Sequence, residues 1–169
     1  MNEETAWAVM SLREQLEAVT AKLRLDGGTI PFLLRHGRTY RWSPLPKGIR
    51  KGRAKACYRN AFILAVRDPS LTYVEGMIGP LITHAWCVTA KGEVVDNTPV
   101  GGLSTQPGPS CEYFGVPFQT EWLRRTVFEK LNGRPGIFPE LWKLDLAEIT
   151  EGIASSTGRT SRRCDRGRA

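Results

Sequence analysis

Three residues with the chemistry of a thiol-based catalytic triad follow one another along the chain: Cys57, His84 and Asp96. A cysteine nucleophile needs surroundings that stabilise its thiolate, a histidine that takes and returns a proton, and a third group that orients the histidine. The chain has only 2 histidines, and one of them lies in the strand-like segment Thr-His-Ala-Trp. With so few histidines, coincidence is a weaker explanation for one at this position. An aspartate within Val-Val-Asp-Asn-Thr is costly to bury unless it has a partner. Together the three residues indicate attack of a thiolate on an acyl carbon.

Cys57 is positioned by a predicted helix over 57–68 that ends at an Asp-Pro pair. Backbone N–H groups at the start of a helix lack helical partners, and together with the helix dipole they stabilise a thiolate. A loop over 43–56, broken by prolines and glycines, leads into this helix. The neighbouring cations Lys55 and Arg59 would favour the thiolate further.

A predicted hairpin brings the other two residues together. A three-residue loop after Thr89 would pair Thr89 with Glu93. Counting away from the loop, back from Thr89 and forward from Glu93, then pairs His84 with Thr98. Asp96 becomes a diagonal neighbour of His84 on the same face of the sheet, within reach of its side chain.

The remaining elements follow from hydrophobic periodicity and from glycine and proline breaks. Helices are predicted over 3–24, 57–68 and 120–133 (with Thr120 as N-cap), a short helical piece over 139–150, strands over 71–79, 81–89 and 93–98, two short strands over 30–42, a strand or turn over 113–118, and a surface loop over 99–112. A helix followed by antiparallel strands predicts an α+β fold. We expect one domain over 1–150 and a disordered basic tail over 151–169.

This arrangement resembles the transglutaminase-like branch of the papain-like cysteine enzymes. Members carry Cys, His and Asp in this order, with an aromatic residue after the histidine and a threonine after the aspartate. The matching residues are Cys57, His84-Ala85-Trp86 and Asp96-Asn97-Thr98, and the segments 73–76 and 113–117 also look like parts of small bacterial and phage proteins of this kind. The resemblance covers about residues 55–118. It implies a catalytic helix packed on an antiparallel sheet.

The resemblance also implies thiol-dependent amide hydrolysis or acyl transfer, of the protease, amidase, deamidase or transglutaminase type. Cys57 would attack the carbonyl, His84 would move the proton, and Asp96 would hold the imidazole. Protein or peptide substrates are the expected partners. Four further residues are predicted to line or support the site, although an aromatic on a buried face is more often part of the core: Asn60, Glu75, Trp86 and Trp42.

The charge distribution supports a rival interpretation. The net charge is +7, and the chain from Gly27 to Arg67 contains ten Lys or Arg residues and no acid. The basic stretch 35–59 could tune the thiol, bind an anionic substrate or nucleic acid, or be a solvated surface. An inactive copy of the fold could therefore be a basic binding module for nucleic acid or an acidic protein, through 35–59 and the arginine-rich tail.

Other classes of protein are disfavoured by the sequence. The four cysteines (Cys57, Cys87, Cys111 and Cys164) lack zinc-site spacings, so we expect neither a metal nor a cofactor. No apolar run is long enough to cross a membrane, so no membrane association is expected. The start of the chain lacks the apolar core of a signal peptide, so the prediction is a cytoplasmic protein with reduced thiols.

Overall fold

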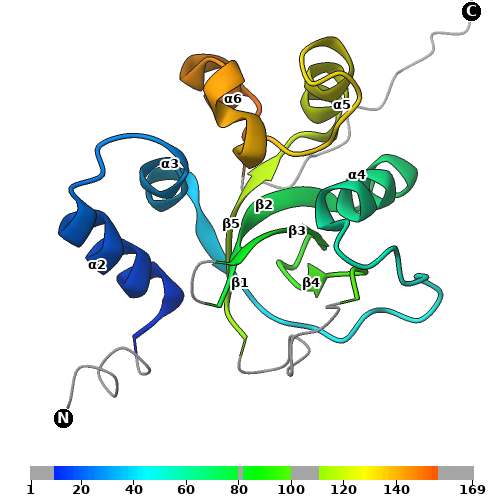
Figure 1. The fold of residues 1–169 in the computed structure, drawn as a ribbon. Helices are drawn as coiled ribbons and strands as arrows, with labels where there is room; N and C mark the ends of the chain where they lie inside the picture. Colours follow the sequence, from blue (N-terminus) through cyan, green and yellow to red (C-terminus); the bar gives the residue numbers. More distant parts are fainter. Residues whose placement is uncertain (1–9, 80–81, 100–110, 156–169) are drawn as a thin grey trace, which may run out of the picture.

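A computed structural model describes residues 10–79, 82–99 and 111–155. Within these residues the structure is mixed α+β, with one antiparallel sheet of order β1-β5-β2-β3-β4 (Figure 1). The strands are β1 (Arg38–Tyr40), β2 (Thr72–Ile78), β3 (Ile82–Val88), β4 (Val94–Val95) and β5 (Tyr113–Phe118). The helices are α2 (Leu12–Leu23), α3 (Thr29–His36), α4 (Cys57–Arg67), α5 (Thr120–Glu129), the 3-10 helix η1 (Phe138–Lys143) and α6 (Leu146–Glu151). The predicted α+β class is confirmed.

The sheet curls until its two edges meet. Arg41 follows β1 at one edge and forms a parallel bridge with Glu93, which precedes β4 at the other edge. The Arg41 carbonyl accepts a hydrogen bond of 2.9 Å from the Val94 N–H, and the Arg41 N–H donates to the Gly92 carbonyl at 3.4 Å. The curl gives the sheet an enclosed inner face and an outer face.

The inner face has a small core of its own. Side chains alternate between the two faces along each strand, so Val74 and Trp86, which pair across β2 and β3, both point inwards. Trp86 is wholly buried, and its ring packs edge-on against Tyr113 at 5.1 Å and Tyr40 at 6.0 Å between centroids. Gly115 makes room for the indole, because a β-carbon there would lie 2.7 Å from it.

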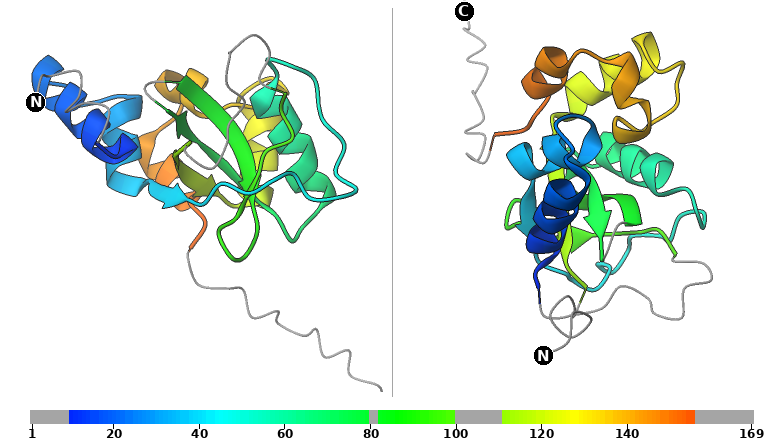
Figure 2. Two further views of the ribbon diagram at one scale, coloured as in Figure 1. Left: turned by 90° about the horizontal axis from the view of Figure 1, so that it is seen from below. Right: turned by 60° about the vertical axis from the view of Figure 1, so that its left-hand side comes forward.

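Helices cover the outer face, as the views of Figure 2 show together with Figure 1. The helix α4 crosses β2 and β3, where the buried small residues Ala61 and Ala65 let it approach the sheet closely. The thiol of Cys87 on β3 donates to the Ala61 carbonyl at 3.2 Å. This packing fixes the start of α4 relative to β3.

The prediction of two strands over 30–42 is wrong in its first half. Residues 29–36 form the helix α3, and only Arg38–Tyr40 form a strand. A short apolar run fits either structure. Helical spacing buries Phe32 and Leu33 together, and Pro31 falls in the first turn, where its missing N–H costs nothing.

Two further boundaries differ from the predictions. The strand predicted over 93–98 is limited to Val94–Val95, because the Thr98 N–H bonds the Asp96 carboxylate instead of a neighbouring strand. At the other end of the chain, Ile153 bridges to Phe118, so the folded part continues past the predicted limit at residue 150. The N-cap of α5 is Gln119 rather than Thr120.

The other predicted elements agree with the structure where it describes them. The helices over 57–68 and 120–133 and the strands over 71–79 and 81–89 are present with shifts of their ends, and the helical piece over 139–150 is divided into η1 and α6. The segment 113–118 is the strand β5, which lies between β1 and β2 in the sheet. The first residues of the predicted helix 3–24, most of the loop 99–112 and most of the tail lie outside the described residues.

Candidate active site

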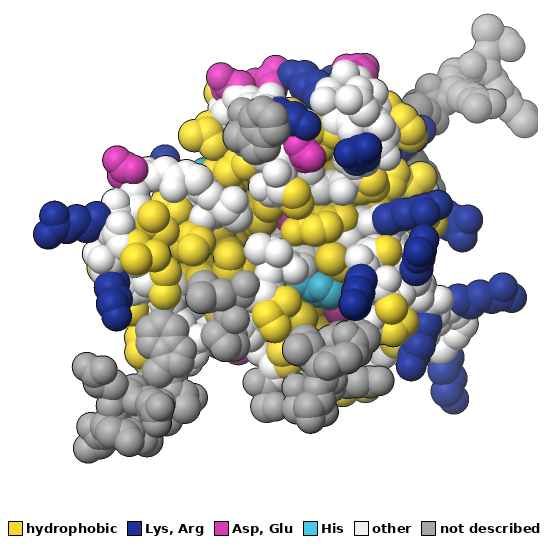
Figure 3. Space-filling view, viewed as in Figure 1, with side chains coloured by type: hydrophobic (Ala, Val, Ile, Leu, Met, Phe, Trp, Pro, Cys, Tyr) yellow, Lys and Arg dark blue, Asp and Glu magenta, His cyan; other side chains and the backbone are white. Residues whose placement is uncertain are grey.

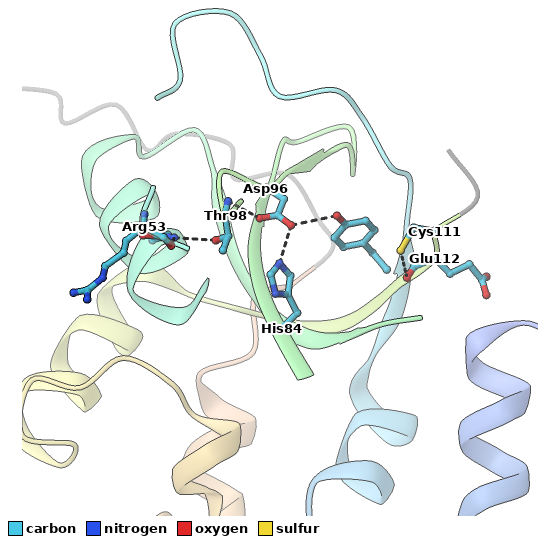
Figure 4. Close-up of polar contacts among 8 residues, drawn as sticks. Arg53, His84, Asp96, Thr98, Cys111 and Glu112 are labelled. Atoms are coloured by element: carbon cyan, nitrogen blue, oxygen red, sulfur yellow. Dashed lines mark hydrogen bonds and ion pairs between the residues drawn. The ribbon is translucent and has the colours of Figure 1, made fainter. Parts of the chain in front are cut away.

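His84 and Asp96 form a buried pair at the inner face of the sheet (Figure 4). The His84 Nε2 and the Asp96 Oδ2 lie 2.7 Å apart, and the two side chains are 8% and 9% exposed. The imidazole stacks beside Trp86, with 6.2 Å between ring centroids and 18° between ring planes. Gly76 is the residue opposite His84 on β2, so no side chain there competes for this space.

The hairpin register that predicted this pair is observed. Cys87 pairs with Val95, and the Thr89 N–H donates to the Glu93 carbonyl at 3.0 Å. Continuing the same register by one residue sets Asp96 opposite Trp86, diagonal to His84. The pair is therefore a consequence of the loop length between β3 and β4.

Two more donors hold the Asp96 carboxylate in place. Its Oδ1 accepts the Thr98 N–H at 2.9 Å, and its Oδ2 accepts the Tyr113 hydroxyl at 3.2 Å in addition to His84 (Figure 4). Tyr113 was not among the residues predicted from the sequence to lie at the site. Its only signal was a tyrosine at the start of a segment whose position in the sheet depends on long-range pairing.

Cys57 is the first residue of α4 and is half-buried. The first bond of the helix runs from the Asn60 N–H to the Ala56 carbonyl at 2.9 Å, and no side chain caps this end. The N–H groups of residues 57–59 therefore have no partner within the helix. The Cys57 side chain lies close enough to His84 to raise the pKa of the imidazole. Because Nε2 is bound to Asp96, Nδ1 is the ring nitrogen left for the thiol.

The surroundings of His84 favour its protonated form. Burial alone lowers the pKa of His84, but its hydrogen bonds with Asp96 and Cys57 and the negative charges of both groups outweigh burial and raise the pKa to about 9. The imidazole is then a cation at neutral pH. A thiol–imidazole catalytic pair requires such a cation beside the nucleophile.

Asn60 connects the helix of Cys57 to the loop of Asp96. Its Nδ2 donates to the Arg53 carbonyl at 2.7 Å and to the Thr98 Oγ1 at 3.0 Å, and its Oδ1 accepts the Arg53 N–H at 3.1 Å. The predicted supporting role of Asn60 is therefore one of position: it joins three segments around the site. Figure 4 shows Arg53 and Thr98 on the same side of Asp96.

Glu75 does not adjoin the pair as predicted, because it lies on the other face of the sheet. It pairs with Ala85, one position from the His84 pairing, so its side chain points outwards under the helices. The wholly buried carboxylate accepts the Tyr73 hydroxyl at 2.7 Å and the N–H groups of Ile137 and Phe138 at 2.6 and 2.8 Å. Glu75 thus attaches the start of η1 to the sheet.

The two predicted tryptophans belong mainly to the inner core. Trp86 supports the imidazole from within the sheet and is not open to solvent. Trp42 is half-buried and packs against the same inner core. Neither forms an open wall beside Cys57 in the described part of the chain.

No family model, no curated protein and no solved structure matches this chain. Within the described residues, no group of three or more His, Cys, Asp or Glu side chains could hold a metal ion. Across 10–79, 82–99 and 111–155, no helix has both the length and the apolar character needed to cross a membrane. Function must therefore be argued from the site itself.

Proposed function

We propose that this chain is a cysteine-dependent enzyme that hydrolyses an amide or ester bond or transfers its acyl group. The observation that carries the proposal is the buried pair of His84 Nε2 and Asp96 Oδ2 at 2.7 Å, with Cys57 close enough to raise the pKa of the same imidazole. The nucleophile comes from the start of α4, the proton carrier from β3, and the orienting acid from the residue that follows β4. That arrangement also supports a transglutaminase-like core, with α4 packed on an antiparallel sheet.

In the proposed reaction the Cys57 thiolate attacks the carbonyl carbon, and the carbonyl oxygen takes up the negative charge. The unpaired N–H groups at the start of α4 are the donors available to that oxygen. The bond to the leaving group then breaks as His84 gives its Nδ1 proton to the departing amine or alcohol. Water or a second amine attacks the thioester and passes its proton to His84, and the thiolate leaves. Asp96 keeps the imidazole oriented throughout.

The test is the rate of iodoacetamide labelling of each cysteine from about pH 5 to pH 9, measured by peptide mass spectrometry. Cys57 should label roughly tenfold faster or more than the half-buried Cys111 below pH 7. His84→Ala should remove that advantage, because the cation beside the thiolate is lost. Equal rates for Cys57 and Cys111, or no effect of His84→Ala, would overturn the proposal.

A binding module that has lost its chemistry is the second candidate, supported by the exposed cations before α4. It predicts nucleic-acid affinity that falls steeply with salt and that survives Cys57→Ala. An enzyme predicts selective labelling of Cys57, which the binding module does not require. The two measurements therefore distinguish the candidates on the same protein preparation.

A further inference from the structure

A dense group of cations borders the site on the side of the loop that leads into α4. Figure 3 shows Lys and Arg side chains gathered over this loop and the adjoining helix. We call this group the basic rim, and it consists of Lys47, Arg50, Lys51, Arg53, Lys55 and Arg59, all exposed. None of the six forms an ion pair with any described residue. Their charge is therefore not neutralised by this part of the protein itself.

The basic rim is fixed to the catalytic frame rather than carried by a free loop. The Gly52 N–H donates to the Asn97 carbonyl at 2.7 Å, and Asn97 is the neighbour of Asp96. Arg53 is held at both backbone groups by Asn60. A β-carbon on Gly52 would lie 2.4 Å from the Asn60 side chain, so only glycine allows this close approach. The backbone that carries these cations is thus held next to the start of α4.

The aromatic residues near the basic rim do not offer bases a surface for stacking. Single-stranded nucleic acid binds through aromatic faces as well as cations. Tyr40 is only 6% exposed and packs on Trp86, and Trp42 packs against the same inner core. Tyr58 is half-buried and packs against the main hydrophobic core. A charged surface without stacking platforms suits carboxylates better than single-stranded bases.

We infer that the basic rim binds acidic side chains of a polypeptide whose acyl group is delivered to Cys57. The inference rests on the proposed function, since an acyl reaction requires a carbonyl and an acidic polypeptide supplies both the carbonyl and the negative charge. Fixed cations beside the nucleophile raise the local concentration of an anionic substrate and speed its association. The effect weakens with salt because exposed charges are screened.

The test uses two tetrapeptide chloromethyl ketones that differ only in carrying two glutamates or two glutamines. Cys57 of the full chain should react roughly tenfold faster with the glutamate probe at low salt, and the ratio should fall toward one near 1 M salt. The double variant Lys51→Gln, Lys55→Gln should reduce the ratio by a large factor. The matched control Lys22→Gln, Arg134→Gln removes two exposed cations outside the basic rim and should leave the ratio unchanged.

The possible outcomes separate this inference from the proposed function. Fast reaction of Cys57 with both probes at equal rates would overturn the inference and leave the enzyme proposal intact. Reaction with neither probe, together with slow iodoacetamide labelling, would overturn the enzyme proposal itself. Polyglutamate should protect Cys57 from the glutamate probe. Stronger protection by a single-stranded DNA oligonucleotide of equal charge would assign the basic rim to nucleic acid and overturn the polypeptide assignment.

Discussion

The Asn60 amide donates a hydrogen bond of 3.0 Å to the Thr98 hydroxyl, and this contact joins the helix of Cys57 to the loop of Asp96. Asn60 is only 8% exposed and Thr98 9%, so water does not readily replace the bond. The same amide also holds the backbone of Arg53 at two points. Nucleophile, orienting acid and basic rim are therefore tied together by one side chain.

Asn60→Ala should disconnect these segments without touching the triad residues. The change leaves the Thr98 hydroxyl, which is buried, and the part-buried Arg53 N–H and carbonyl without their partner, and an unsatisfied buried group costs about 1–3 kcal/mol. We expect a lower free energy of unfolding in urea and slower iodoacetamide labelling of Cys57. Thr98→Val is the matched control, since it removes one of the three bonds.

The control should lose about 1 kcal/mol and keep most of the labelling rate. If Asn60→Ala and Thr98→Val lose the same amount, the contacts with Arg53 contribute nothing and the loop is held by other means. If Asn60→Ala loses stability but labels at the rate of the wild type, Asn60 supports the fold and not the geometry of the site.

Asp96→Asn should lower the pKa of His84. Burial lowers that pKa, and the hydrogen bond with Asp96 is the largest of the effects that raise it to about 9. Removing the negative charge leaves burial less opposed, so we expect a fall of about one unit or more. The measurement is an NMR titration of the imidazole C–H resonances.

His36 serves as the internal reference in the same titration. It lies on α3, and burial and Arg35 lower its pKa from 6.5. Its titration should not change in Asp96→Asn. An unchanged His84 titration would mean that the 2.7 Å contact with Asp96 does not govern the charge of the imidazole.

Local rules were sufficient to predict the pair of His84 and Asp96. A hairpin loop length fixes the register of its two strands, so two residues 12 positions apart can be placed from sequence alone. The start of α4 at Cys57 was also predictable, because the preceding prolines and glycines exclude a helix there. No local pattern, however, predicts which segment lies on the far side of Asp96.

The contacts that were not predicted all depend on pairing between distant segments. Tyr113 reaches Asp96 because β5 lies next to β2 in the sheet, although Tyr113 and its partner Ile78 on β2 are 35 positions apart in the chain. Glu75 was expected near the site because it is close to the site elements in the sequence. Side chains alternate between the two faces of the sheet along β2, however, and the Glu75 side chain points toward η1. The segment 29–36 was ambiguous because a short apolar run suits a helix or a strand equally well.

The free energy of unfolding should fall as the pH rises from about 6.5 to about 9, because His84 loses its proton in this range. Its folded pKa of about 9 lies above the ordinary value of 6.5, so the folded state holds the proton more tightly. This stabilisation is complete below about pH 6.5 and is lost as the pH approaches 9, up to about 3 kcal/mol. Urea unfolding of wild type and His84→Gln at both pH values measures it. The difference between the two proteins should shrink from pH 6.5 to pH 9, and a constant difference would contradict the raised pKa.

Glu75 should produce a second pH dependence in a lower range. Burial raises the pKa of Glu75 to about 7, against the opposing effect of the bonds from Phe138, Ile137 and Tyr73. The folded state therefore binds the proton more tightly than the unfolded chain, and stability should fall as the pH rises from about 4.5 to 7.

Glu75→Gln isolates this effect. The glutamine cannot ionise, but its NH₂ group takes the place of one carboxylate oxygen and must face an N–H group that donates to that oxygen in the wild type. Leaving this buried N–H group without an acceptor costs about 1–3 kcal/mol. We expect the variant to be less stable than the wild type at pH 5, with a smaller deficit at pH 8, where the wild type has lost its own contribution. Tyr73→Phe removes one donor and keeps the carboxyl group, so it should retain the pH dependence. Parallel curves for wild type and Glu75→Gln would show instead that Glu75 keeps the same charge in the folded and unfolded states across this range.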